Sequence, residues 1–278
     1  MYKLLNAGFY RLRKNKIFWG IIVITLCMAC FCLKLKGAGN GIDLLLLDNL
    51  VSIGFFISIF TSLFVGLEYA NGTIRNKMVV GHSRIKIYLS NLIISITVGI
   101  IIEFVYMLFV AIIGLPILGG LQIPISQFIK ILLNILMIIV TYSSIFNCIT
   151  LLCHDITMST VIGIILILVM FVADGALSYT ANAEKYRYQI TSDENGVITK
   201  EIIGLDSNYP GETKKKIAQF IKYIMPTGQA NQISLNVSNQ IRLQEQAVDT
   251  TNLLWYSIGT ATIINVMGIY FFSKKELK

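Results

Sequence analysis

The chain has 278 residues, of which 55% are hydrophobic and only 14% are charged, and its formal net charge is +8. This composition is too apolar for a soluble domain and predicts a membrane protein with several spans. The excess of Lys and Arg does not indicate a nucleic-acid partner, because these residues cluster beside the apolar runs, where they set the orientation of the spans.

The first sixteen residues combine an apolar face with several basic side chains. Leu5, Phe9 and Leu12 share one helical face, while Lys and Arg occupy the others. This pattern is typical of a short helix in the headgroup plane of a bilayer. A signal peptide is the weaker interpretation, because no convincing small-residue cleavage site follows and the chain continues with further spans. We therefore predict an interfacial helix over residues 1–16.

Six apolar segments are long enough to cross a bilayer, which takes roughly 20 helical residues. They predict one all-α, polytopic transmembrane domain over residues 1–278. The approximate spans are 17–34, 44–67, 87–115, 129–152, 157–177 and 253–272.

The segment that joins the second and third spans, residues 68–86, is the most informative part of the sequence. Asn71 and Gly72 interrupt the second span, and Thr73 is a suitable N-cap for a short helix over residues 74–80. Gly81 is expected to end that helix, and Ser83 can cap the third span.

The composition of this short helix favours a protein partner. Ile74 and Met78 share one face, and Arg75 and Arg84 stand around them. Such a surface suits a groove on another protein. The alternative is a basic loop that rests on anionic lipid, which needs the charges but not the glycine-bounded helix.

Glu103 lies near the middle of the third span. A carboxylate at that depth is costly and usually faces a partner or a cavity. Two interpretations stay open: Glu103 lines a translocation path or holds a helix contact, or the third helix is displaced so that Glu103 lies near an interface.

The sequence gives little indication of a metal or catalytic site. Cys27, Cys30 and Cys32 lie inside the first span, where they behave as small apolar residues. No HExxH or paired CxxC pattern is present, and His154 with Asp155 fits a solvated turn. We therefore predict no cofactor and no enzymatic activity in this chain.

Residues 178–250, before the last span, are predicted to be extracellular and partly ordered. Two β-prone runs, 186–191 and 197–203, favour a hairpin. A following amphipathic helix, expected on the outer membrane surface, presents four apolar residues that could form a lid over the path, or could pack on a partner subunit or the bilayer. These four are Ile217, Phe220, Ile221 and Ile224.

Basic residues predict the orientation of the spans. Lys and Arg are concentrated before the first span, between the second and third spans, and after the last span. With six spans, these three places lie on one side, so both termini are expected in the cytoplasm.

The segment between the second and third spans resembles that of permease subunits of type-two ATP-binding-cassette exporters, which are ABC transporter permeases. The family pattern there is Glu, three residues, Gly-Thr, an aliphatic residue and later Ser-Arg. The matching positions are Glu68, Gly72, Thr73, Ile74, Ser83 and Arg84. Two departures are Gly81, where many relatives have Pro, and Asn91, where Lys is frequent.

The resemblance implies a coupling helix that inserts into a separate ATPase subunit. This sequence has no GxxxxGK[ST] phosphate loop, so ATP and magnesium would bind in two ATPase partners. A second permease subunit, identical or homologous, and a bacterial plasma membrane location are also implied. The expected coupling residues are Glu68, Gly72, Thr73, Ile74, Arg75, Met78, Gly81, Ser83 and Arg84. The expected substrate is an exported peptide, either antimicrobial, bacteriocin-like or signalling, or another amphipathic molecule.

Two other classes of function remain open. A non-transporting sensor or immunity protein would bind a peptide through residues 178–250 and work without ATP hydrolysis. An intramembrane enzyme would need Glu68, His82, His154 or Asp155 to converge in a wet cavity.

Overall fold

The computed structural model describes residues 1–36, 41–153, 155–183, 185–192, 198–205, 209–243 and 250–275. Within these ranges, six helical segments are long and apolar enough to cross a bilayer, so the chain is an all-α, multi-pass membrane protein as predicted. The spans are α2 (Lys16–Lys36), α3 (Ile42–Leu47) continued by α4 (Asn49–Ala70), α6 (Arg84–Leu118), α7 (Ile125–Leu152), α8 (Ile156–Ala181) and α11 (Thr251–Lys274).

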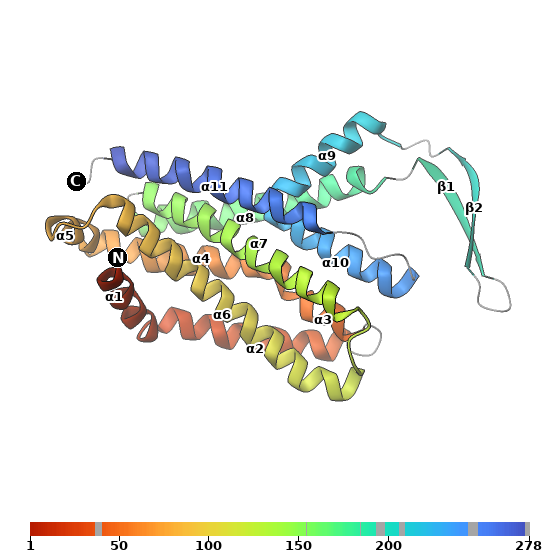
Figure 1. Cartoon of the computed structure of the whole chain (residues 1–278), viewed down its shortest axis with the longest axis horizontal. Coiled ribbons are helices and arrows are strands. Elements are labelled where there is room, and N and C mark those ends of the chain that lie inside the picture. Colours follow the sequence, from red (N-terminus) through yellow and green to blue (C-terminus); the bar gives the residue numbers. More distant parts are fainter. Residues whose placement is uncertain are drawn as a thin grey trace.

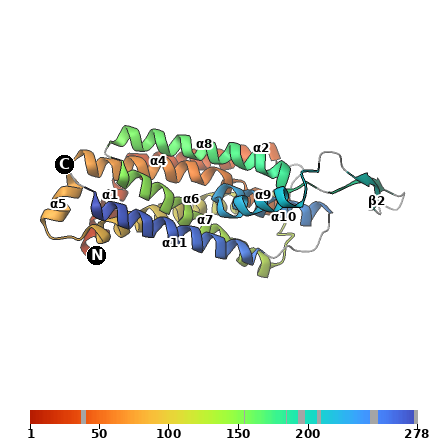
Figure 2. The same cartoon turned by 90° about the horizontal axis from the view of Figure 1, so that it is seen from above.

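The spans form an elongated bundle whose two ends differ (Figures 1 and 2). The N-terminus, the short helix α5 (Thr73–Val79) and the end of α11 lie together at one end, which we call the α5 end. Strands β1 (Tyr186–Ser192) and β2 (Ile198–Leu205) extend from the other, the hairpin end, and pair antiparallel as expected. The three basic segments of the sequence therefore lie at the same end of the bundle.

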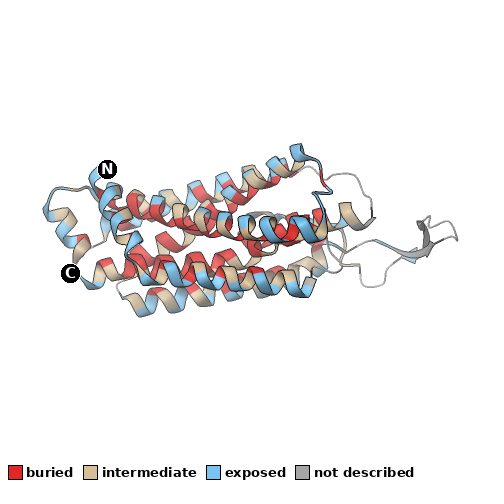
Figure 3. Cartoon of the chain, turned by 90° about the horizontal axis from the view of Figure 1, so that it is seen from below, coloured by how far each residue is buried: buried red, intermediate tan, exposed pale blue. Residues whose placement is uncertain are grey.

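Helix α4 is the central element of the bundle and packs against α6, α7 and α8. Its aromatic residues Phe60 and Phe64 are fully buried toward the α5 end, and Leu50 and Ile53 are fully buried toward the hairpin end. The outer helices expose their remaining apolar faces, as Figure 3 shows. Such faces are expected where a bundle meets lipid or a further subunit.

Small residues allow the spans to approach one another closely. Gly268 of α11 lies against Tyr88 of α6, and a Cβ atom at position 268 would come within 2.4 Å of the tyrosine hydroxyl oxygen. That hydroxyl donates a hydrogen bond to Asn265 Oδ1 of α11 (3.0 Å). Close backbone approach combined with an interhelical hydrogen bond is the usual way that helices associate in membranes.

Helix α1 (Tyr2–Arg13) packs across the start of the bundle instead of extending α2. It buries Leu4, Gly8 and Leu12, and Gly8 contacts Ile94 of α6. The predicted apolar face was right at Leu12, but its centre lies toward Leu4 and Gly8, because α1 rests on α6 through its smallest residue. Asn15 then accepts hydrogen bonds from the first amides of α2.

Helices α9 (Glu212–Ile224) and α10 (Pro226–Leu243) form a re-entrant pair at the hairpin end. Thr227, at their turn, donates to the carbonyl of Met170 in α8. Met170 lies 11 residues before Ala181, the last residue of α8, so the turn reaches about 16 Å into the bundle. The predicted helix on the outer surface is therefore wrong in placement: α9 runs antiparallel along α8, and α10 buries Ala230, Ile233 and Val237 in the core.

Candidate functional site

The link between α4 and α6 is a short helix held between two glycine-containing bends. α4 ends at Ala70, and Gly72 adopts a left-handed conformation (φ 62°) as the N-cap of α5. The predicted N-cap, Thr73, is instead the first residue of α5, because the glycine takes the positive φ that a threonine would resist.

The far end of α5 closes as predicted at Gly81. The amide of Gly81 donates to the Met78 carbonyl and that of His82 donates to the Lys77 carbonyl, the pair of bonds that defines a Schellman motif. Gly81 has φ 94°, which this motif requires at that position. Ser83 then caps α6 by accepting the amide of Lys86, which confirms its predicted role.

Glu68 is buried at the point where four helices meet at the α5 end. Its carboxylate, in α4, forms ion pairs with Arg11 of α1 and with Lys77 of α5 (2.5 Å), and accepts a hydrogen bond from Asn91 of α6 (3.1 Å). Only 1% of the side chain is exposed. Glu68 therefore joins the flanking helices to α5 and has no free surface for contact with another protein.

Of the residues predicted to form the contact face of α5, Arg75 is exposed, whereas Ile74 and Met78 are not. Ile74 is only 2% exposed and packs into the core, and Met78 is partly buried against it, so the predicted Ile74–Met78 contact face points mainly inward. Val79 and Val80 are instead 80% and 76% exposed, and Arg75 is exposed as well. We call Arg75, Val79 and Val80 the α5 surface.

Arg84 binds the end of α11 rather than pointing outward. Its guanidinium donates to the carbonyls of Phe272, Ser273 and Lys275. These are C-terminal carbonyls without a partner inside their own helix, so the positive charge satisfies them and favours the helix dipole.

Lys275 plays the same part for α7. Its ammonium group donates to the carbonyls of Leu151, Leu152 and Cys153, each at 3.0 Å. Burial lowers the pKa of Lys275, an effect that the adjacent Cys153 thiol partly opposes. The hydroxyl of Tyr69 in α4 also donates to the Leu151 carbonyl (2.6 Å). The ends of α4, α6, α7 and α11 are thus tied together directly beside α5.

Glu103 lies in the interior of α6, with 3% of its surface exposed. Its Oε2 accepts a hydrogen bond from Asn49 Nδ2 of α4 (2.7 Å), and no donor among the described residues reaches its Oε1. A cavity of about 190 Å³ between α6 and α7 is lined by Glu103 and otherwise by apolar side chains. Glu103 is therefore a helix contact at the edge of a cavity.

The four predicted lid residues lie on the face of α9 that points away from α8. Ile217 and Phe220 are more than half exposed, and Ile221 and Ile224 are more than one third exposed. The opposite face is polar: Lys222 is 1% exposed, donates to Ser178 Oγ (2.7 Å) and pairs with Asp174 (3.6 Å). The bundle thus binds the polar face of α9 and leaves much of its apolar face exposed, although the ring of Phe220 contacts that of Tyr256 in α11.

The groups of the enzyme alternative do not form a recognisable site in the part of the chain that is described. No hydrogen bond or ion pair among these residues joins Glu68 to His82 or Asp155, and His154 lies outside the described residues. No group of metal-ligating side chains occurs in the same ranges.

The sequence interpretation missed the partners of Glu68: Arg11, Lys77 and Asn91. A signal was present, because an acidic residue at the end of an apolar span needs donors, and a basic helix and a basic link both lie at that end. Which of the nearby cations would pair with Glu68 depends on how α1 folds back over α6, and this is a tertiary property.

These features define a class: a multi-pass membrane protein whose second and third spans are joined by a short helix that is ion-paired to the bundle and exposes its outer surface. The sequence matches the ABC-2 type transporter family over residues 2–190, more than half of the chain, and the protein therefore belongs to that family. Comparison with curated proteins gives no match. Members of this family are the membrane components of transporters, and this chain is therefore a transport membrane component.

Proposed function

We propose that this chain is the transmembrane subunit of an ATP-driven exporter and that the α5 surface docks into a separate ATPase subunit. The observation that carries the proposal is that Val79 and Val80 are largely exposed beside Arg75, on a helix that the ion pair between Lys77 and Glu68 attaches to the bundle. Two adjacent valines on a water-exposed bend expose apolar area at a cost, and a protein groove removes that cost.

The ion pairs of Glu68 give this docking site a mechanical connection to the spans. A displacement of α5 acts on Lys77, and through Glu68 on α4, on α1 through Arg11 and on α6 through Asn91. Because the ends of α7 and α11 are bonded to the same region by Lys275 and Arg84, movement of α5 would shift several spans together.

If ATP is hydrolysed in a separate subunit, the transporter needs further chains. Two ATPase subunits would bind ATP and magnesium, and a second permease subunit, identical or homologous, would complete the path. The α5 end is then cytoplasmic, in agreement with the basic residues gathered there, and the hairpin end is extracellular in a bacterial plasma membrane.

The proposed substrate is a peptide or another amphipathic molecule. Glu103 and its cavity would border the path within the membrane, and the largely exposed apolar face of α9 would form part of its outer end. An apolar face next to a polar, ion-paired interior suits a substrate that carries both kinds of surface.

Co-purification of this chain with ABC ATPase subunits from its native membrane tests the proposal. Val79→Asp combined with Val80→Asp should reduce the retained ATPase at least tenfold and abolish stimulation of its ATP hydrolysis, because charges replace the buried contact. Leu121→Asp combined with Ile125→Asp, at the link between α6 and α7, is the control, since it makes the same charge change at two exposed apolar residues far from α5 and should retain the ATPase. Equal retention in all three proteins would reject the α5 surface as the docking site.

A further inference from the structure

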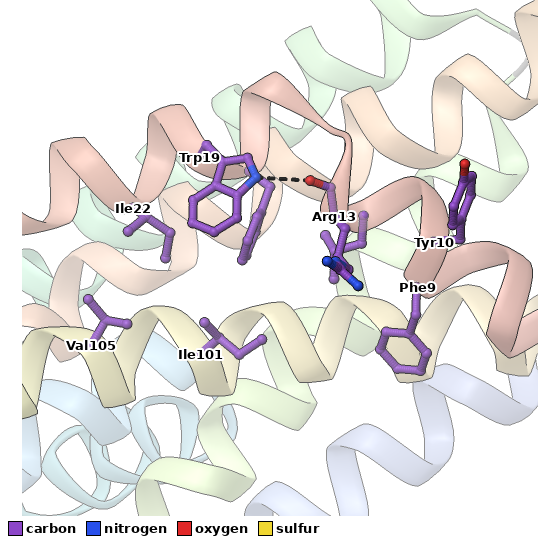
Figure 4. A pocket seen from close by; sticks show the side chains of 9 residues that line it. Phe9, Tyr10, Arg13, Trp19, Ile22, Ile101 and Val105 are labelled. Atoms are coloured by element: carbon purple, nitrogen blue, oxygen red, sulfur yellow. Dashed lines mark hydrogen bonds between the residues drawn. The ribbon is translucent and has the colours of Figure 1, made fainter.

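A large apolar groove lies at the α5 end, between the α1–α2 elbow and α6 (Figure 4). Its volume is about 860 Å³. Phe9 and Leu12 come from α1, Phe18, Trp19 and Ile22 come from α2, and Ile101 and Val105 come from α6. These side chains make the groove almost wholly apolar along its length.

The groove has one cationic residue in its lining. Figure 4 shows the side chain of Arg13 directed into the space between α1 and α6. In the described part of the chain, no hydrogen bond or ion pair engages this guanidinium, whereas Arg11, two residues earlier, is paired with Glu68. The backbone carbonyl of Arg13 is occupied, because it accepts a hydrogen bond from Trp19 Nε1 (3.0 Å).

The charged and apolar groups of the groove lie in the same order as the headgroup and acyl regions of one bilayer leaflet. Arg13 and Trp19 lie at the start of the first span, where basic and tryptophan side chains occupy the headgroup level. Ile22 is six residues beyond Lys16, so the apolar part of the groove extends about 9 Å toward the bilayer centre. A cation thus lies at headgroup depth and an apolar channel lies below it.

We propose that this groove binds one anionic phospholipid of the adjacent leaflet, with its phosphate on the Arg13 guanidinium and an acyl chain between α2 and α6. An acyl chain removes the apolar lining from water, and the exposed, unpaired guanidinium of Arg13 favours an anionic headgroup over an uncharged one. The bound lipid would support α1, whose residue Arg11 holds the carboxylate of Glu68. This proposal concerns lipid binding alone and does not depend on the proposed transport function.

Fluorescence of Trp19 tests the proposal directly. The chain has two tryptophans, so Trp255→Phe leaves Trp19 as the sole reporter in the full-length protein. The protein would be placed in vesicles of brominated phosphatidylcholine, which quenches a nearby tryptophan, and unbrominated phosphatidylglycerol would be added. If the anionic lipid occupies the groove, it should relieve quenching with about fivefold preference over unbrominated phosphatidylcholine, equivalent to about 1 kcal/mol for one basic residue.

Variants separate the groove from general surface charge. Arg13→Gln should bring the preference close to one, whereas Lys3→Gln, the same charge change at an exposed α1 position outside the groove, should leave it near fivefold. Val105→Phe, which fills the groove, should reduce quenching of Trp19 by brominated chains of either headgroup.

Equal affinity for both lipids, or equal effects of the Arg13 and Lys3 changes, would overturn the proposal. Shielding of Trp19 from all brominated lipid would also overturn it, because a second protein subunit would then cover the groove.

Discussion

The carboxylates of Glu68 and Glu103 are both almost fully buried, but their charges are balanced in different ways. Glu68 has two cations and an amide as partners, contributed by three other helices. Glu103 has one neutral amide, from Asn49, and among the described residues its second oxygen has no donor. Asn91, beside Glu68, is 12 residues from Glu103 in α6, so the two carboxylates are separated by about 18 Å along that helix.

The difference indicates that Glu68 has a structural role, whereas the carboxyl group of Glu103 is available for another role. A buried charge is tolerated when paired and hydrogen-bonded, and Glu68 meets that condition within the folded chain. Glu103 does not meet it among the described residues, because a donor reaches only one of its two oxygens. Replacing each carboxylate by an amide of equal size should therefore have unequal effects.

Glu68→Gln should have the largest effect. Removing the charge leaves Arg11 and Lys77 facing a neutral amide, and loss of one partner from a buried ion pair typically costs about 3–5 kcal/mol. We expect a lower unfolding temperature in detergent, and faster proteolytic cleavage within residues 71–82 because α5 is released from α4.

Asp155→Asn serves as the control for this measurement, because it makes the same chemical change at an exposed position. It should leave both the unfolding temperature and the cleavage rate unchanged. If Glu68→Gln were equally silent, the ion pairs of Glu68 would not be what holds α5 in place.

Much of the α5 end could be predicted from the sequence, because it depends on local chemistry. Gly81 and Ser83 act at the two ends of one bend, and their roles follow from backbone conformation and capping within a few residues. The orientation of α5 could not be predicted in this way. Ile74 points inward and Val79 outward because Lys77 is attached to Glu68, and that contact joins elements through the tertiary fold.

Gly81→Ala should have an intermediate effect on the same joint. At φ 94°, an alanine is strained by roughly 1–2 kcal/mol, although its Cβ would meet no other atom within 4 Å. We expect modestly lower stability and weaker ATPase retention, because the exit of the chain from α5 is altered. Gly20→Ala, in α2 and equally free of contacts, has no positive φ and should stabilise the protein slightly or leave it unchanged. Equal stability of the two variants would show that the Gly81 conformation is not required.

The hairpin end was harder to predict, because an amphipathic helix can pack on the bundle through either its apolar or its polar face. Ile217, Phe220, Ile221 and Ile224 correctly indicated a helix, and a solvent-facing polar surface was the simpler assumption. The bundle instead supplies Asp174 and Ser178 as partners for Lys222, and this reverses which face of α9 is buried. Only the position of α8 beside α9 decides between the two arrangements.

Glu103→Gln should have the smallest effect on folding and so gives the clearest contrast with Glu68. The amide retains the size of the side chain and can still accept the hydrogen bond from Asn49, while the cost of burying a charge disappears. We expect the unfolding temperature to stay the same or to rise slightly. If the carboxyl group borders the transport path, substrate-stimulated ATP hydrolysis of the assembled transporter should nevertheless fall, and Glu103→Asp should restore part of it. A loss of stability comparable to that of Glu68→Gln would show instead that Glu103 is as fully integrated into the fold as Glu68, and the distinction between the two carboxylates would not hold.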